Sequence, residues 1–360
     1  MPNRIRGLDG FRAIAIFLVL ATHFQLWIKL GVTDPRVLAV IQGRYGVRPF
    51  FVMSGFLITW IMIREHTKTG TISLRKFFMR RSIRIFPLYF LFLGVLYLLT
   101  QMGYTRIKDC TFNYVATYTT NFAPATCNSP ATSHLWSLAV EEHFYLFWPL
   151  IFLLGKRFAF VFAVAFATLS ATSGHVVLDY FPEASLTRWT FPAAAPIAYG
   201  AIAAFVCNTD WVRRIFGPSW YAPIVRILLV LGIISPAFMD SMTLQYATIA
   251  LVVLYFYHNQ NSVVVKALEL KPIVWIGVMS YGLYVWHGMF MGTGPYRFSG
   301  SKIPFDQDIG LIITLIVTPI VYYGFERPIL RLKDRFAWDK RKPGDPKPGE
   351  MAARPVQIAD

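Results

Sequence analysis

The chain has 360 residues, of which 55% are hydrophobic and only 15% are charged. Soluble domains carry about 25% charged residues, so this chain is too apolar to have water as the solvent for most of its surface. The formal net charge of +16 is compatible with nucleic-acid binding. In a membrane protein, however, the first question is on which side of the membrane the basic residues lie. The composition therefore excludes an ordinary soluble protein and indicates an integral membrane protein.

Apolar runs recur along the chain at short intervals. A bilayer core of roughly 30 Å needs about 20 apolar residues per helix. The runs predict an all-α membrane protein with about ten transmembrane helices in one bundle, because the connections are mostly short and no internal repeat is visible. The predicted helices lie near residues 8–29, 48–63, 83–102, 135–154, 158–173, 191–207, 222–239, 243–257, 272–291 and 308–325.

The basic residues are distributed unevenly between the two predicted sides of the membrane. With the N-terminus in the cytoplasm, most of the 35 Lys and Arg fall on the inner side. This is the positive-inside pattern, so both termini are predicted to be cytoplasmic. The bilayer then explains the charge, and no nucleic-acid partner is expected.

Two segments outside the predicted helices differ in composition from the rest. Residues 103–134 form a polar outer loop that contains Cys110 and Cys127, and an oxidising compartment on that side predicts a disulfide between them, with two unpaired thiols as the alternative. Cys207 lies near an inner helix end, and no metal-site spacing is present. Residues 331–360 are charged and Pro-rich, which predicts a disordered cytoplasmic tail after a transmembrane domain of residues 1–330.

The first apolar run carries three polar residues that fall near one helix face. Asp9 precedes Arg12 by three residues, which places the two on the same helix face. Arg12 and His23 are eleven residues apart, so their side chains point within about 20° of one another around the helix axis and lie roughly 16 Å apart along it. Ionisable groups in hydrocarbon are costly, so this stripe is a candidate site, with His23 able to act as a base near neutral pH. The alternative is a buried histidine that bonds a neighbouring helix. The run lacks a cleavage site and is therefore read as a retained helix rather than a signal peptide.

A second polar group lies in HLWSLAVEEHFYLFWP, where His134, Ser137, Glu141 and Tyr145 fall near one side of a helix. Glu142 and His143 are expected to face away from that side. Glu141 is suited to orient an imidazole or to bind a sugar hydroxyl. The alternative is an acid at a helix start, which the helix dipole favours.

Two further motifs are ambiguous on spacing alone. Arg80, Arg81 and Arg84 in MRRSIRIF offer planar cationic donors for phosphates, or serve only as positive-inside anchors. In SYGLYVWHG, Tyr281, Tyr284 and His287 follow at three-residue steps, which an aromatic belt also explains.

Taken together, these motifs resemble the acyltransferase 3 family of bacterial membrane-bound O-acyltransferases. The resemblance extends to about residue 330 and rests on LDGFRAIAIFLVLATHF, FFVMSGFLIT, RRSIRIFPLYF, HLWSLAVEEHFYLFWP, SYGLYVWHG and the closing FERP. It implies a ten-helix core in the bacterial plasma membrane that transfers an acyl group, usually acetyl, from cytoplasmic acetyl-CoA to a hydroxyl. Acetyl-CoA would be a co-substrate, and no cofactor or metal is expected to be bound permanently.

The resemblance also assigns roles to individual residues. It places the arginine-then-histidine motif on Arg12 and His23. Catalytic roles are then expected for these two residues, Asp9 and Glu141, with His23 either a general base or a transient carrier of the acyl group. The basic motif falls on Arg81 and Arg84 and implies a donor site there, to which the adjacent Arg80 is assigned as well. Acceptor binding is expected from His134, Trp136, Ser137, Tyr284 and His287.

Two positions depart from the family pattern and bear on the choice of acceptor: His143 stands where many relatives have Gln, and Arg48 stands where many have Asp. Arg188 lacks the acidic residue that often follows it in relatives, so it is only a minor site candidate. The expected acceptor is a cell-surface or lipid-linked carbohydrate. The alternatives are a small metabolite such as an antibiotic, or a transporter that uses the polar stripe as a solute path.

Overall fold

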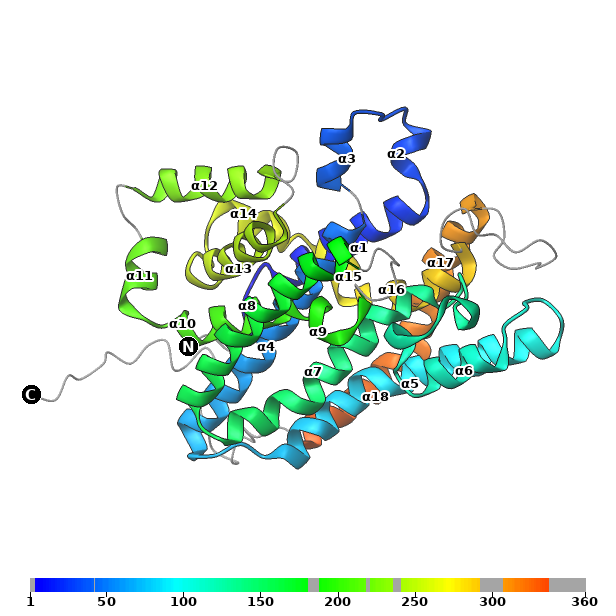
Figure 1. Ribbon diagram of the computed structural model, residues 1–360, viewed down its shortest axis with the longest axis horizontal. Coiled ribbons are helices and arrows are strands. Elements are labelled where there is room, and N and C mark those ends of the chain that lie inside the picture. Colours follow the sequence, from blue (N-terminus) through cyan, green and yellow to red (C-terminus); the bar gives the residue numbers. More distant parts are fainter. Residues whose placement is uncertain are drawn as a thin grey trace, which may run out of the picture.

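The computed structural model describes residues 4–41, 43–180, 188–217, 221–235, 241–291 and 307–336. These residues form a helical bundle, and no strand occurs among them (Figure 1). The α-helices are α1 (Leu8–His23), α2 (Leu26–Lys29), α3 (Pro35–Ile41), α4 (Arg44–Thr69), α5 (Leu74–Gln101), α6 (Asp109–Ala116), α7 (Trp136–Leu153), α8 (Lys156–Tyr180), α9 (Thr190–Ala193), α10 (Ala195–Val206), α11 (Asp210–Phe216), α12 (Ala222–Ile234), α13 (Met242–His258), α14 (Val263–Leu268), α15 (Lys271–Val278), α16 (Ser280–Met291), α17 (Gln307–Val321) and α18 (Arg327–Leu330). Shorter 3-10 helices are η1 (Thr120–Phe122), η2 (Ala125–Cys127), η3 (Ser133–Leu135) and η7 (Arg331–Phe336), and η6 (Tyr322–Glu326) is a π-helix.

Each apolar run that the sequence predicts as a helix contains one, but three runs are interrupted. The run near 191–207 is divided into α9 and α10. The first run stops at His23, because Gln25 adopts a left-handed backbone conformation with φ of 55°, and α2 starts in a new direction. The run near 272–291 is divided into α15 and α16, which meet at an angle of 62°. The break after α1 lies beside His23, and the break between α15 and α16 lies beside Tyr281 and Tyr284, so two of the three breaks adjoin candidate site residues.

Several helices have the length and apolar surface that a bilayer requires. Among the described residues, Tyr45–Thr69, Leu74–Gln101 and Asp308–Lys333 are long and apolar enough to cross a membrane, and the bent pair α15 and α16 is a possible fourth span. Large apolar side chains on α12 and α17 face outward, including Leu228 and Ile320. The helices thus fit a multi-pass membrane protein, while the count of ten spans and the sidedness of the termini remain predictions.

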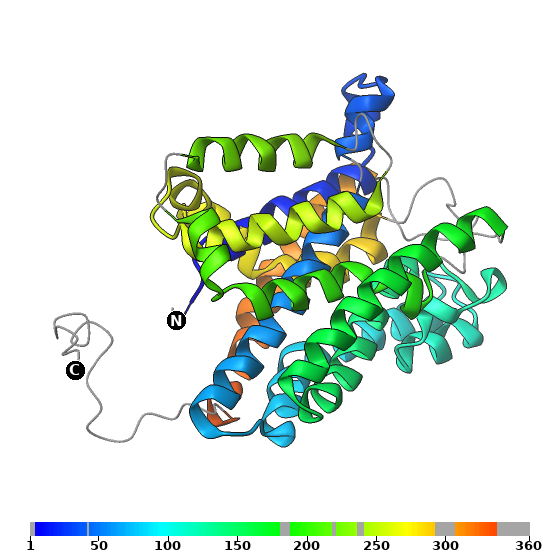
Figure 2. The same ribbon diagram turned by 60° about the vertical axis from the view of Figure 1, so that its left-hand side comes forward.

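The centre of the bundle is the packing of α4 against α10 and α1 (Figure 2). Gly55 on α4 and Gly200 on α10 allow the first contact, because a Cβ atom at either position would overlap the backbone of the opposite helix. Small residues at such crossings let two helix backbones approach closely inside a membrane. The crossing fixes α4, which contributes one wall of the cavity described below.

The loop that follows α5 is closed by the predicted disulfide. Cys110 and Cys127 are bonded, and their Cα atoms are 5.5 Å apart. The hydroxyl of Thr111 donates a hydrogen bond to the carbonyl oxygen of Cys127 at 2.8 Å, which ties α6 to the same segment. The prediction of this pair is confirmed, and Cys207 is a buried free thiol.

Replacing both Cys110 and Cys127 by serine is expected to loosen this segment without dismantling the bundle. The two cysteines are 17 positions apart in the sequence. A disulfide that closes a loop of this length restricts the unfolded chain and contributes about 3 kcal/mol to the free energy of unfolding. Limited proteolysis of membrane vesicles should therefore cleave between residues 103 and 134 faster in the double variant. Equal cleavage rates with and without the disulfide would contradict this expectation.

The start of the predicted tail is helical. Arg331–Phe336 forms η7, which packs on α5, and the guanidinium of Arg80 donates a hydrogen bond to the carbonyl oxygen of Phe336 at 2.9 Å. The predicted tail boundary after residue 330 therefore cuts through an ordered contact. Residues 337–360 of that prediction lie outside the described residues.

Candidate active site

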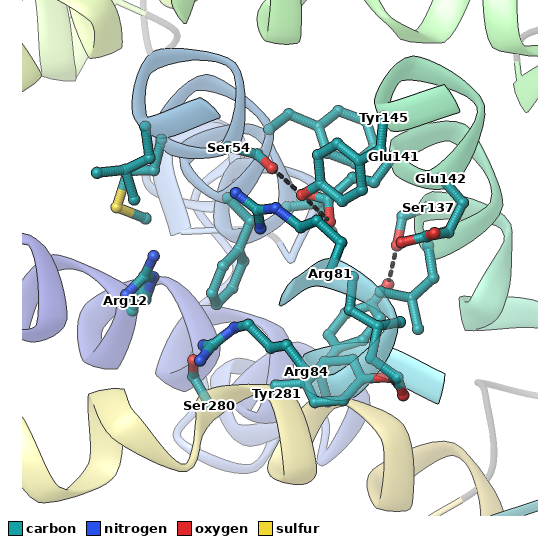
Figure 3. A pocket seen from close by; sticks show the side chains of 18 of the residues that line it. Arg12, Ser54, Arg81, Arg84, Ser137, Glu141, Glu142, Tyr145, Ser280 and Tyr281 are labelled. Carbon is teal, nitrogen blue, oxygen red and sulfur yellow. Dashed lines mark hydrogen bonds between the residues drawn. The ribbon is translucent and has the colours of Figure 1, made fainter. Parts of the chain in front are cut away.

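A cavity of about 410 Å³ lies between α1, α4, α5, α7 and α16 (Figure 3). Its walls carry many charged side chains among the apolar ones. The charged residues that line it are Arg12, Arg80, Arg81, Arg84, Glu141, Glu142 and Lys333. Five cationic groups and two carboxylates give the cavity an excess of positive charge, which favours an anionic ligand.

Three guanidinium groups meet at one side of this cavity. Arg12 comes from α1, whereas Arg81 and Arg84 come from the third turn of α5, and all three reach the same space in Figure 3. They are close enough for Arg81 and Arg84 to repel Arg12 electrostatically. Arg12 is held by Asp9, with 2.9 Å between Nη1 and Oδ1, but Arg81 and Arg84 have no ion pair with any described residue. Like charges collected in this way are stabilised by an anion such as a phosphate.

Arg80 plays a different part from its neighbours. Its guanidinium forms an ion pair with the buried Glu65 at 3.4 Å and donates to Phe336, so it links α4, α5 and η7. Lys333 on η7 also lines the cavity, although the sequence analysis placed it in the tail. The structure thus brings Arg80 to the cavity wall with its charge already paired, and it adds Lys333 to the cationic set.

The carboxylate of Glu141 lies on the wall opposite α1 within a short hydrogen-bonded chain. Tyr145 donates to Oε2 of Glu141 at 3.2 Å, Ser54 on α4 is hydrogen-bonded to the same tyrosine hydroxyl, and Arg81 lies over the Tyr145 ring at 4.8 Å (Figure 3). Glu142 also lines the cavity, so the expectation that it faces away is wrong. The cavity extends around a wider arc of α7 than one helix face, which is why both adjacent carboxylates reach it.

Other predicted residues lie away from the cavity. His143 is hydrogen-bonded through Nδ1 to Thr190 at 2.6 Å and stacks on Phe122, as its position on α7 predicts. Trp136 packs edge-on against Phe51 and does not line the cavity. Arg48 lies over the rings of Tyr45 and Tyr246, with its guanidinium carbon 5.0 Å and 5.4 Å from their centroids.

Three histidines from separate helical segments form a cluster next to the cavity. The ring centroids of His23 and His287 are 4.8 Å apart, and those of His287 and His134 are 4.6 Å apart. His287 therefore stands between the other two. Within the described part of the chain, no group of His, Cys, Asp and Glu has the arrangement of a metal site.

Tyr284 connects this histidine cluster to the cavity. Its ring lines the cavity and packs against His134 and His287, with centroid distances of 5.5 Å and 5.3 Å. Its hydroxyl donates to the carbonyl oxygen of His134 at 2.8 Å and is 2.7 Å from the hydroxyl of Ser137, which also lines the cavity. His23 is not among the lining residues, but it contacts His287, which in turn contacts the lining residue Tyr284.

Gly288 makes room for this arrangement. A Cβ atom at this position would overlap Cε1 and Nδ1 of His134. We expect Gly288→Ala to displace the His134 ring and to destabilise the protein by about 1–3 kcal/mol, the usual cost of overpacking. Thermal unfolding of the detergent-extracted protein measures the effect, and Gly94→Ala on α5 is the control, because nothing lies within 4 Å of a Cβ atom there. Equal melting temperatures for the two variants would contradict the assigned packing.

The fold and the site together define a helical membrane protein with an internal cationic cavity joined to a histidine cluster. The chain belongs to the acyltransferase 3 family, because residues 5–324 match the family model described as an acyltransferase domain. This match confirms the resemblance drawn from the motifs.

Individual relatives carry names that agree with this family. The chain is 27% identical to O-acetyltransferase OatA of Staphylococcus aureus (strain NCTC 8325 / PS 47), over 91% of this chain and 57% of that protein. It is also 27% identical to peptidoglycan O-acetyltransferase OatA of Listeria monocytogenes, over 79% of this chain and 49% of that protein. The chain thus spans about half the length of the curated relatives it matches. No solved structure matches the chain.

Proposed function

We propose that the protein transfers an acetyl group from acetyl-CoA to a hydroxyl of a cell-surface carbohydrate. The observation that carries the proposal is the cavity itself, which has a cluster of guanidinium groups on one wall and Tyr284, in contact with the histidine cluster, on another. Acetyl-CoA fits such a cavity, because its phosphates need the cationic wall whereas its thioester carbon, at the end of a long arm, needs a base nearby.

The donor end is assigned to the guanidinium groups without carboxylate partners. Arg81 and Arg84 can offer paired N–H groups to phosphate oxygens, and Lys333 on η7 can add a third cation. The sequence pattern predicts that this end of α5 is cytoplasmic, the compartment that holds acetyl-CoA. Arg12 holds α1 through Asp9 and contributes charge to the same space.

The reacting end is assigned to His23. Arg12 and His23 are separated by eleven residues of α1, which is about 16 Å along the helix, so an extended donor arm is needed between phosphates and thioester. His23 would take the proton from the acceptor hydroxyl while the hydroxyl oxygen forms a bond to the acetyl carbon. The carbon–sulfur bond then breaks, and the proton passes to the departing thiolate, giving an ester and free CoA.

The acceptor class follows from the relatives. Their names specify O-acetyl transfer, and one specifies peptidoglycan. A carbohydrate acceptor arriving from the outer side of the plasma membrane fits the position of His23, which lies at the end of α1 opposite to the cationic cavity wall. Glu141, within its chain of Tyr145 and Ser54, is available to bind the donor or to orient the groups that react.

The proposal is tested by base-labile acetate on purified peptidoglycan and on extracellular polysaccharide. A strain that lacks the gene should lose this acetate from one of the two fractions, and the intact gene should restore it. Unchanged acetate in both fractions, with an acetylated small molecule missing from the cells, would favour the metabolite as acceptor. Loss of a solute flux with no change in any ester would favour a transporter.

A further inference from the structure

His287 is buried at the centre of the histidine cluster, and only one of its ring nitrogens has a partner. The residue is fully buried, and its Nδ1 lies 2.6 Å from the carbonyl oxygen of Tyr284. A carbonyl oxygen only accepts hydrogen bonds, so Nδ1 carries the proton and Nε2 of the neutral ring carries a lone pair. Nε2 is buried and has no hydrogen-bond partner among the described residues. Such an acceptor is costly to leave unpaired, which indicates that a donor reaches it in the working protein.

His134 cannot be that donor. Its Nε2 lies 3.2 Å from the carbonyl oxygen of Val285 and must carry the ring proton, so its Nδ1 is also a bare lone pair. Two lone pairs do not form a hydrogen bond.

His23 is the imidazole that can donate to His287. Its ring centroid is 4.8 Å from that of His287, and it makes no hydrogen bond to any described residue. The torsion between Cβ and the imidazole ring is soft, so a modest rotation of the His23 ring can direct an N–H group at Nε2 of His287. The carbonyl of Tyr284 accepts from Nδ1 of His287, which leaves Nε2 of His287 as an acceptor. The nitrogen of His23 that faces this acceptor would then be the one that carries a proton.

We propose that His287 is a positioning residue that accepts a hydrogen bond from His23 and leaves the opposite nitrogen of His23 as the base. This inference rests on the proposed function, because it concerns the imidazole that removes the proton from the acceptor hydroxyl. When His23 takes that proton it becomes an imidazolium, and its hydrogen bond to the neutral His287 becomes charge-assisted and stronger. His287 therefore stabilises the charge that develops on His23.

Two conservative substitutions separate this role from a structural one. In His287→Gln the amide oxygen can occupy the position of Nε2, which preserves the acceptor for His23. In His287→Asn the amide lies at the position of Nδ1, which preserves only the hydrogen bond to Tyr284. We expect the Gln variant to keep about a tenth or more of the wild-type rate and the Asn variant to fall about 100-fold, the lower range for loss of acid–base assistance. The KM for acetyl-CoA should change less than about twofold, because His287 does not line the donor cavity.

The measurement is the initial rate at which membrane vesicles from the producing strain transfer label from acetyl-CoA to their own glycan. A Gln variant no more active than the Asn variant would overturn the proposal. If either variant fails to fold, Nε2-methylhistidine at position 287 provides the test, because it keeps the N–H group that faces Tyr284 and blocks the acceptor. It should abolish transfer in a protein whose thermal unfolding shows that it is folded, and retained transfer would overturn the proposal. Wild-type vesicles that transfer no label would instead contradict the proposed function.

Discussion

Replacing His23 by alanine is expected to abolish acetyl transfer while the protein remains folded and inserted. At this end of α1 the imidazole is the group that can take a proton from the acceptor hydroxyl, and general-base assistance contributes about 10²–10⁴-fold to a rate. The small side chain of alanine fits a helix end, so α1 should persist. Base-labile acetate on the glycan of a deletion strain, at matched membrane levels of each variant, measures the loss.

His258→Ala is the matched control for the His23 variant. His258 lies on α13, is hydrogen-bonded to the carbonyl oxygen of Cys207 at 2.9 Å, and stacks on Phe216 away from the cavity. It should retain most of the activity. A His23→Ala protein that keeps more than about 5% of the wild-type esterification would place the base elsewhere, because such a residual is above the loss expected for a general base. His134 or His287 would then be the next candidate.

Replacing both Arg81 and Arg84 by alanine is expected to reduce kcat/KM for acetyl-CoA by about 100-fold or more, mainly through KM. A hydrogen bond to a charged group contributes about 1.5–3 kcal/mol, and each 1.4 kcal/mol is tenfold in affinity. Neither side chain has an ion pair among the described residues, but Arg81 interacts electrostatically with Glu141 and Glu142, so the amount of folded protein in the membrane is measured alongside activity. The rate of labelled ester formation as a function of acetyl-CoA concentration separates KM from kcat.

Arg75→Ala provides the control for charge on the same helix. Arg75 is exposed near the start of α5 and does not line the cavity. Its loss removes a positive charge from the same region and should leave KM nearly unchanged. A similar rise in KM in the Arg75 variant would show that general surface charge, rather than the cavity, attracts the donor.

The long helices could be predicted from the sequence because each contains an apolar run of sufficient length. The interruptions could not, and neither could the short helices α3, α6, α11 and α14, which lie outside those runs. The end of α1 depends on the left-handed backbone of Gln25, a conformation that residue type alone does not indicate. The bend between α15 and α16 places Ser280, Tyr281 and Tyr284 along the cavity, and it lies at Met279, a residue type that does not itself predict a break.

Part of the site could also be predicted from the sequence. Arg12, Arg81, Arg84 and Glu141 stand out as charges within or next to apolar runs, and all four line the cavity. Spacing along one helix cannot show which other helix lies opposite, so the contact of His287 with both His23 and His134 emerges only from the fold.

Two cavity residues were misplaced for local reasons. Lys333 was assigned to the tail because its neighbours are charged and Pro-rich, although η7 packs on α5. Glu142 was placed on the wrong side of α7, because a helical wheel assumes a narrow active face whereas the cavity follows a wider arc.

The most direct test of the account is the fate of acetyl label supplied on one side of the membrane. Sealed inverted vesicles, whose cytoplasmic face is outward, receive labelled acetyl-CoA, and the label is then sought as base-labile acetate on carbohydrate. The account predicts labelled ester with the wild-type protein, much less with the Arg81 and Arg84 double variant, and none with His23→Ala. Labelled ester that forms equally in vesicles of all three proteins would contradict it.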